Sequence, residues 1–379
     1  MKASIAMTGQ KILDFSYSQL KEWVCAMGEP GYRADQILRW VYGRLATSFE
    51  QMTDLPQPLR QKLASVASLF SLIPIDEKVS ADGSTRKVLF QTHDEKTIES
   101  VLMLYPKTGL SRERRTICVS TQVGCPVGCP FCATGQQGFE RNLDTGEIIE
   151  QILYFMRLLN TRQLSQEILP NLVRRPVTNV VFMGMGEPLA NYEAVWQSIV
   201  MLNSNHGLEI GARQITVSTA GLVLQIKRLA RESVHVELAV SLHAARDDLR
   251  NTLVPINRKY PLGQLIPECW EYLKKTGRRP TFEYALFQGI NDSLSHARDL
   301  SLLLKGLNCH VNLMVGNPTT NPNFIPPPIK RVVAFQNYLT ESGVSNSLRA
   351  SKGVDIDAAC GQLRSRWLNM EPKTQGAQA

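Results

Sequence analysis

The sequence has 379 residues and a formal net charge of +8, with a pI near 9.1. Hydrophobic residues make up 43% and charged residues 20%, and no apolar run approaches the roughly 20 residues that a membrane helix needs. These values argue against a membrane role, and the excess of Lys and Arg favours a polyanionic partner such as nucleic acid. The first residues contain no apolar core followed by a small-residue cleavage site, so we expect no secretory signal and a cytoplasmic location.

The N-terminal part of the chain has the spacing of amphipathic helices. Apolar residues recur at helical intervals from Tyr17 to Leu69, with glycine and proline between the runs. We therefore predict a helical N-terminal module over residues 1–75. Two short apolar runs at 87–90 and 98–103 flank a turn-rich stretch and predict a connecting β-hairpin within residues 76–110.

Beyond residue 110, short β-branched runs alternate with amphipathic stretches, which is the pattern of βα units around a parallel sheet. The predicted strands are 116–121, 177–183, 214–218, 234–241, 281–286 and 309–314. The predicted helices are 145–159, 192–203, 223–232, 262–275, 293–305 and 328–342. Six units are too few for the closed eight-stranded barrel, so we predict an α/β fold with an open, partial (βα)6 barrel over residues 111–345. Residues 346–379 form a C-terminal segment, which carries Cys360 and ends in a polar, disordered tail.

Unusual residues follow five of these six strands. In parallel α/β folds, functional groups come from the loops at the carboxyl ends of the strands, so these residues are expected to share one rim. The segments are a cysteine-rich loop at 124–132 and the stretches 184–188, 218–221, 241–243 and 316–318.

Eight cysteines in a chain without an export signal are more typical of thiols, metal ligands or catalytic groups than of a disulfide framework. Cys125, Cys129 and Cys132 lie in a loop rich in Gly and Pro, and thiolates at this spacing favour zinc or an iron–sulfur cluster. A zinc site usually has a fourth ligand nearby, and no Cys or His follows within the next seventy residues. A cluster with one open iron is therefore favoured, and a zinc knuckle is the alternative. Three cysteines with apolar neighbours are predicted to be packing residues: Cys25, Cys269 and Cys309.

The Cys-x3-Cys-x2-Cys loop resembles the defining motif of the radical S-adenosylmethionine (SAM) superfamily. The resemblance implies a 4Fe–4S cluster on Cys125, Cys129 and Cys132, with SAM chelating the open iron through its amino and carboxylate groups. One-electron reduction would then release a 5′-deoxyadenosyl radical. The Gly-Met-Gly-Glu-Pro segment is similar to the methionine-binding turn of this superfamily. In that turn Glu187 would accept hydrogen bonds from the SAM ammonium, and Gly186 would allow close approach of the backbone.

Further segments resemble the RlmN/Cfr family of RNA adenine methyltransferases, and within it the RlmN type. The resemblance covers most of the chain and implies methylation of carbon 2 of adenosine in 23S rRNA and in tRNA, with two SAM molecules and a flavodoxin or ferredoxin as electron donor. It also implies that the N-terminal module binds RNA, and we expect a monomer without a membrane partner. Carbon-8 methylation, as in the Cfr-like branch, and a non-catalytic zinc RNA-binding protein are the alternatives. The segments that carry the resemblance are 32–34 with Trp40, 52–56, 137–143, 211–219 and 355–363.

The same resemblance implies three catalytic residues, Cys360, Glu99 and Cys118. Cys360 would be methylated by a first SAM, and the radical from a second SAM would take hydrogen from that methyl group, so that a methylene radical adds to adenine. Glu99 would remove the ring proton, and Cys118 would free the Cys360 sulfur by forming a disulfide bond. Without the resemblance, Cys118 is more simply a buried strand cysteine and Glu99 the solvent-facing side of a hairpin.

Five rim residues match SAM contacts of the family, although a rim hydroxyl or a buried core histidine would give the same pattern. The chain departs from the family at Met314-Val315-Gly316, where Ile-Pro is common, and at Lys352, where the family carries arginine. Lysine does not reproduce a bidentate arginine contact. The matching rim residues are Ser218, Ser241, Leu242, His243 and Asn317.

Overall fold

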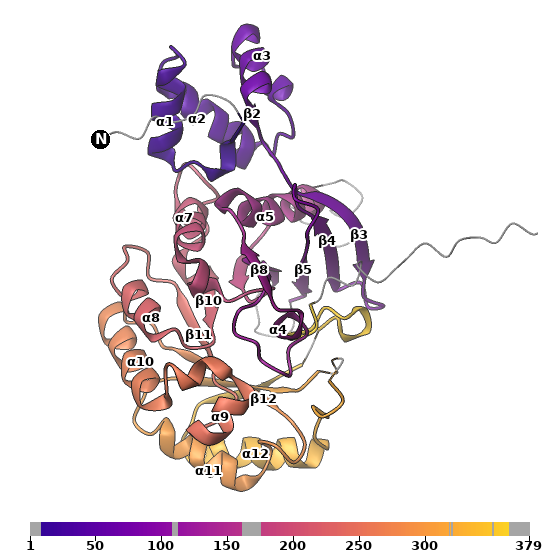
Figure 1. Ribbon diagram of the computed structural model, residues 1–379, viewed down its shortest axis with the longest axis vertical. Coiled ribbons are helices and arrows are strands. Elements are labelled where there is room, and N and C mark those ends of the chain that lie inside the picture. Colours follow the sequence, from indigo (N-terminus) through magenta and orange to yellow (C-terminus); the bar gives the residue numbers. More distant parts are fainter. Residues whose placement is uncertain are drawn as a thin grey trace, which may run out of the picture.

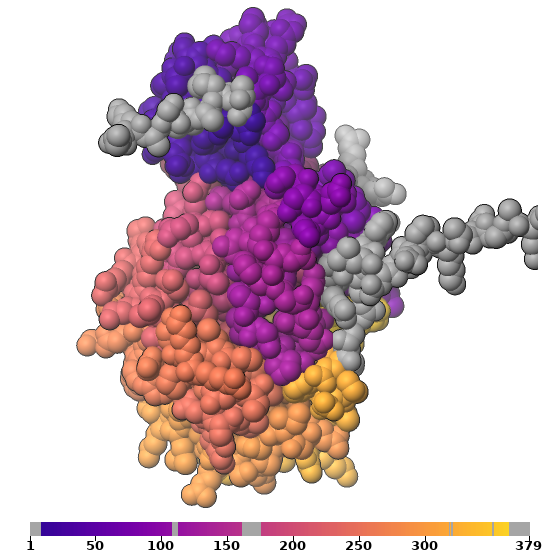
Figure 2. All heavy atoms as spheres, in the orientation of Figure 1, coloured from indigo at the N-terminus to yellow at the C-terminus, as the bar shows by residue number. Residues whose placement is uncertain are grey.

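A computed structural model of the chain describes residues 9–107, 113–160, 176–317, 319, 321–350 and 352–363. Three helices make up most of the N-terminal part, namely α1 (Tyr17–Ala26), α2 (Tyr32–Leu38) and α3 (Gln57–Val66), and they form a lobe on the larger α/β body (Figures 1 and 2). No helix among the described residues is long and apolar enough to cross a bilayer.

The start of α1 shows how local sequence forms this lobe. The Ser16 side chain accepts from the Gln19 backbone N–H while the Gln19 side chain accepts from that of Ser16, which is a capping box. Beyond it, Leu20, Trp23 and Val24 lie on one helical face and are fully buried. Their apolar core continues into helices of the body, α5 (Thr145–Asn160) and α7 (Tyr192–Asn203), through Ile149, Leu153 and Met201.

One ten-stranded sheet organises the body, in the order β14-β13-β12-β11-β10-β9-β6-β5-β4-β3. The strands from β6 to β14 are parallel, and β3 to β6 pair antiparallel. The strands are β3 (Ile73–Val79), β4 (Thr85–Gln91), β5 (Thr97–Tyr105), β6 (Arg114–Cys118), β9 (Asn179–Phe182), β10 (Ile215–Thr219), β11 (Glu237–Ser241), β12 (Thr281–Leu286), β13 (His310–Val315) and β14 (Asn346–Arg349).

Helices lie on the outside of the parallel part, as Figure 1 shows, and the described sheet has β14 and β3 at its two edges. The predicted α/β fold with an open parallel sheet and a helical N-terminal region is confirmed, and all six predicted strands and helices are present. Besides α5 and α7, the covering helices are α8 (Val223–Leu229), α10 (Leu262–Thr276), α11 (Leu294–Leu303) and α12 (Ile329–Glu341).

Two features of the sheet differ from the prediction. The connecting hairpin is three antiparallel strands that extend the main sheet, because an additional strand, β3, precedes β4 and β5. A seventh parallel strand, β14, pairs with β13 after the last predicted unit. Both additional strands are edge strands whose residues are exposed or half-buried. The strand β14 has one apolar residue, and β3 is interrupted by Pro74 and by the charged run Asp76-Glu77-Lys78, so neither has the sustained apolar alternation that identifies a strand from sequence.

Asp14 joins the N-terminal lobe to the body. Its Oδ1 accepts the Gly146 N–H of the first turn of α5 at 2.7 Å, so replacing Asp14 with alanine leaves this helix donor without its acceptor. We expect Asp14→Ala to lower the free energy of unfolding by about 1–2 kcal/mol, measured by urea denaturation. Asp14→Asn keeps an acceptor oxygen and should lose less. Equal stability of Asp14→Ala and the wild type would contradict this role.

Candidate active site

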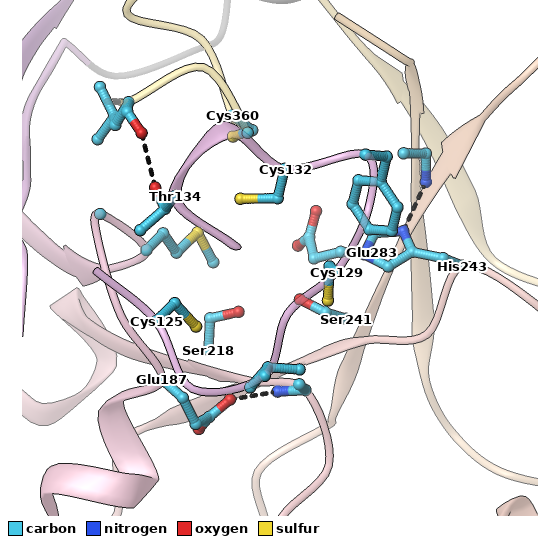
Figure 3. Close-up of a pocket in the computed structure, with 18 of the residues that line it drawn as sticks. Cys125, Cys129, Cys132, Thr134, Glu187, Ser218, Ser241, His243, Glu283 and Cys360 are labelled. Atoms are coloured by element: carbon cyan, nitrogen blue, oxygen red, sulfur yellow. Dashed lines mark hydrogen bonds between the residues drawn. The ribbon is translucent and has the colours of Figure 1, made fainter. Parts of the chain in front are cut away.

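The residues predicted from the strand ends meet around one cavity. Figure 3 shows several of them around a single open space. Most of the residues that line this cavity come from the carboxyl ends of β9, β10, β11 and β13 and the segments that follow them, and from the cysteine loop and the C-terminal segment. The geometry therefore brings together ten residues that the sequence singled out. They are Cys125, Cys129, Cys132, Gly186, Glu187, Ser218, Ser241, His243, Asn317 and Cys360.

The loop with the three cysteines is held at its base by a small hairpin of β7 (Gln122–Gly124) and β8 (Phe139–Asn142). At Gly124 the backbone has φ +74°, and a Cβ there would lie 1.8 Å from the Gly138 carbonyl oxygen, which accepts the Cys125 N–H at 2.7 Å. Only glycine fits this closure. The helix α4 (Ala133–Gln137) begins directly after Cys132.

Burial raises the pKa of the Cys125 thiol to about 12 and that of Cys129 well above its usual value. Binding of a metal would lower the pKa of these thiols, because a thiol that coordinates a metal is deprotonated. Among the described residues, no group of three or more His, Cys, Asp or Glu side chains meets closely enough to hold a single metal ion. In a cubane each thiolate would bind its own iron, so the three need not meet at one point, and all three cysteines line the cavity (Figure 3). These soft donors fit an iron–sulfur cluster.

Glu187 follows β9 and is buried, with 3% of its surface exposed. Its two carboxyl oxygens accept the Leu189 N–H at 3.0 Å and the Ala220 N–H at 2.6 Å, and burial raises its pKa to about 7. The preceding Gly186 has φ +105°, and a Cβ there would lie 2.7 Å from Cβ of Gln122. The turn is thus packed against β7, with a buried carboxyl group that can accept from a ligand ammonium.

His243 lies two residues after the end of β11 and has φ 56°, a conformation that non-glycine residues rarely adopt and that often marks functional sites. Its Nδ1 accepts the Ala285 N–H at 3.0 Å, which leaves the proton on Nε2. Burial lowers its pKa to about 3, so the ring is neutral. Leu242 is different: its side chain is fully buried in the core, and it is not among the residues that line the cavity.

Arg250 was not identified from the sequence, although it fixes two loops of this rim. It is fully buried in α9 (Asp247–Leu253), and its guanidinium donates to the carbonyl oxygens of Ala220 at 2.6 Å, Ser241 at 3.1 Å and Leu242 at 3.1 Å. It therefore joins the loops that follow β10 and β11. An arginine in a short polar helix is typical of an exposed surface, so no local pattern marks this one.

A second, smaller cavity adjoins the first, and Cys360 lines both. Cys118 at the end of β6 lines the second cavity and is buried, and burial raises the pKa of its thiol. All eight cysteines are free, so the expected disulfide bond is not formed in this structure. Cys269 and Cys309 are buried as predicted, whereas the packing prediction for Cys25 is wrong, because that residue is exposed.

Three hydrogen bonds fasten the segment around Cys360 to the cluster loop and the rim. The Ala133 N–H donates to the Gly361 carbonyl at 2.8 Å, and the Thr134 hydroxyl donates to the Leu363 carbonyl at 2.7 Å. On the other side, the Asn317 amide donates to the Cys360 carbonyl at 3.0 Å. Cys360 is thus held beside the last cluster cysteine.

Glu99 lies on β5 with only 5% of its surface exposed, so the solvent-facing alternative is wrong. Val101 pairs with Cys118 across β5 and β6, and alternate residues of a strand share a face, so Glu99 lies on the face that carries Cys118. Glu99 itself lines neither cavity, and its carboxylate lies 2.9 Å from the Lys87 ammonium.

The two departures from the family pattern also lie beside these cavities. Met314 lines both cavities, and a Cβ at Gly316 would lie 2.2 Å from the Phe287 ring, so this glycine is needed for close packing. Lys352 donates to the Ser84 hydroxyl at 2.8 Å and to the Leu104 carbonyl at 3.2 Å. The lysine therefore ties the C-terminal segment to the edge of the sheet.

Comparison with known proteins agrees with this geometry. Residues 10–69 match the ribosomal RNA large subunit methyltransferase N-terminal domain, and residues 119–300 match the radical SAM superfamily. A "Probable dual-specificity RNA methyltransferase RlmN" of Moorella thermoacetica is 47% identical over 348 residues, which cover 91% of this chain and 94% of the relative. The protein of the same name from Geobacillus thermodenitrificans is 43% identical over 94% of this chain and 93% of its own. This chain belongs to the RlmN family of radical SAM methyltransferases.

A solved relative of this RlmN-family chain has the same fold. It is a radical SAM methyltransferase from Sphaerobacter thermophilus, 48% identical, with a TM-score of 0.87 over 94% of this chain and 99% of that one. Membership of the superfamily gives this chain its cofactors, a 4Fe–4S cluster and SAM. The resemblance seen in the sequence is therefore confirmed.

Arg250→Lys should weaken SAM binding about tenfold, because an ammonium cannot reach both loops and a lost charged hydrogen bond costs about 1.5–3 kcal/mol. The measurement is calorimetric titration of reconstituted enzyme with SAM. Asn257→Ala is the matched control, since Asn257 accepts from the same guanidinium at 2.6 Å without belonging to the rim loops. Unchanged SAM affinity in Arg250→Lys would show that SAM binding does not depend on the hydrogen bonds from Arg250 to the two loops.

Proposed function

We propose that this chain methylates carbon 2 of adenosine in 23S rRNA and in tRNA, through an S-methylated Cys360. The observation that carries the proposal is the position of Cys360, which lines both the cavity with the cluster cysteines and the cavity with Cys118. Relatives named as dual-specificity RNA methyltransferases support an RNA substrate. Their names do not specify the carbon atom.

The chain's own residues would bind the cofactors at the first cavity. Cys125, Cys129 and Cys132 would hold the cluster, and Glu187 would accept from the SAM ammonium. The SAM ribose and adenine would contact a set of rim residues. When bound, the cluster and SAM supply one-electron chemistry and the methyl carbon, which a non-nucleophilic ring carbon requires. The proposed rim contacts are Gly186, Ser218, Ser241, His243 and Asn317, whereas Leu242, also implied by the resemblance, has its side chain in the core.

Three residues would act on the RNA. Cys360 carries the methyl carbon, which would lose one hydrogen atom to the radical that the bound cofactors supply and then bond to carbon 2 of adenine. The unpaired electron of this adduct would return to the cluster. Glu99 takes the proton from carbon 2 of this adduct. The Cys118 thiol loses its proton and its sulfur bonds to the Cys360 sulfur. The bond between that sulfur and the carbon breaks, and the carbon takes its electron pair and a proton to become the methyl group, which leaves a disulfide. The buried Cys118 and Glu99 lie on one face of the sheet, which suits these consecutive roles.

We also propose the division of the chain into an RNA-binding module over 1–75, a connecting β segment over 76–110, a partial barrel over 111–345 and a C-terminal segment over 346–379. Arg33 and Arg44 lie against aromatic rings of the N-terminal lobe, which supports a surface suited to RNA. A flavodoxin or ferredoxin as electron donor, a monomeric state and a cytoplasmic location complete the proposal.

The deciding experiment is anaerobic reconstitution with iron, sulfide, SAM and an rRNA fragment, followed by mass spectrometry of the digested RNA. We expect a brown protein and 2-methyladenosine. Formation of 8-methyladenosine would instead support the Cfr-like alternative. A colourless protein with stoichiometric zinc and no product would support the non-catalytic zinc RNA-binding alternative.

Cys118→Ala should accumulate protein covalently attached to RNA, because no thiol is then present to attack the Cys360 sulfur and release the RNA. The adduct is measured by denaturing gel electrophoresis with labelled RNA. Cys269→Ala, which changes a core cysteine outside both cavities, is the matched control and should form no lasting adduct. Normal product without adduct in Cys118→Ala would refute the resolving role.

A further inference from the structure

A buried ion pair joins β4 and β5, two of the antiparallel strands beside the parallel part of the sheet. Lys87 on β4 and Glu99 on β5 lie on the same face as diagonal neighbours, since Leu89 is the residue opposite Glu99. The ammonium is 2.9 Å from the carboxylate, and the two side chains are 8% and 6% exposed. Charges are rarely buried this deeply without a role, because removing them from water is costly.

The same ammonium also bonds to the segment that carries Cys360. Lys87 Nζ donates to the backbone carbonyl of Asp357 at 3.1 Å, three residues before Cys360. Asp357 has φ 54°, so the chain turns sharply there. One buried cation thus contacts both the carboxylate of Glu99 and the segment of Cys360, whose atoms act on the same adduct in the proposed function.

We propose that Lys87 is a positioning residue that couples Glu99 to the Cys360 segment. It keeps the Glu99 carboxylate ionised for proton removal, and it fixes the distance between that carboxylate and the sulfur that carries the methyl group. This inference rests on the proposed function, and its test separates the two.

The neighbouring elements place other charged groups on this side of the sheet, but the ion pair and hydrogen bonds described for them are with residues other than Glu99. Arg349 pairs with Glu283 at 3.5 Å, and Lys352 bonds to Ser84 and Leu104. Burial keeps the Cys118 thiol neutral by raising its pKa. The charged and titratable groups on this side are Lys87 on β4, Tyr105 on β5, Cys118 on β6, Arg349 on β14, and Lys352, Asp357 and Cys360 in the C-terminal segment.

The test measures how fast the protein–RNA adduct decays in a single turnover of the Lys87→Met holoenzyme. The decay is followed from about pH 6 to about pH 9, because the pKa of a carboxylate that acts as a base is often raised toward neutral pH. A buried carboxylate that loses its cation binds its proton more tightly, so the midpoint of the pH–rate profile should rise by about one unit, with about tenfold slower decay near neutral pH. Lys87→Arg keeps the cation and should restore most of the rate.

Lys352→Met is the matched control, because Lys352 also fastens the C-terminal segment but bonds to Ser84 and Leu104. Both methionine variants should increase hydrogen exchange at 353–360, and only Lys87→Met should shift the profile. An unshifted profile in folded, cluster-loaded Lys87→Met overturns the coupling, as does an equal shift in both variants.

Failure of the proposed function itself would look different. Wild-type enzyme that forms neither adduct nor methyladenosine would contradict the function, whatever Lys87 does. Glu99→Gln should hold the adduct at every pH, and its normal decay would remove the role of Glu99 as the base. Cys360 methylation, followed by mass spectrometry of the protein, should persist in Lys87→Met and shows that this variant is folded and binds SAM.

Discussion

The hydrogen bonds between the start of α4 and the Cys360 segment are the constraint on which the site depends. The backbone and side chain that immediately follow Cys132 donate to Gly361 and Leu363, so residues more than two hundred positions apart in the chain share one wall. Other contacts of the C-terminal segment, which include the buried Ala358 and the hydrogen bond from Asn317, join it to the core and the rim instead. Placement of Cys360 therefore depends on the same loop that places the metal donors.

The antiparallel strands β3 to β5 provide the second support of that segment. The Ala81 N–H donates to the Asp355 carboxylate at 2.8 Å, and Lys87 and Lys352 bond on either side of this contact. The parallel strands supply the loops of the first cavity, whereas these additional strands supply Glu99 and hold the Cys360 segment. The two parts of the sheet thus serve the two proposed halves of the reaction.

Much of the architecture follows from periodicity. The helix 192–203 and the strand 281–286 have the predicted bounds, because each combines a regular apolar pattern with clear flanking residues. Cys125, Cys129 and Cys132 were recognisable because their spacing is local. Lys87 and Arg250 were not, since their partners lie on other elements and only folding brings a buried charge to several distant acceptors. The edge strands β3 and β14 were missed for the related reason that strands with little buried surface carry a weak or interrupted apolar pattern.

The apolar core of the N-terminal lobe extends through Ile149, Leu153 and Met201 into the helices of the body. A shared core of this kind opposes hinge motion between the lobe and the barrel, because any such motion would separate packed side chains. If the lobe binds RNA as proposed, the enzyme behaves as a preformed template. In that case the RNA, and not the protein, changes conformation on binding, because the target base must leave its stack and extend to the rim.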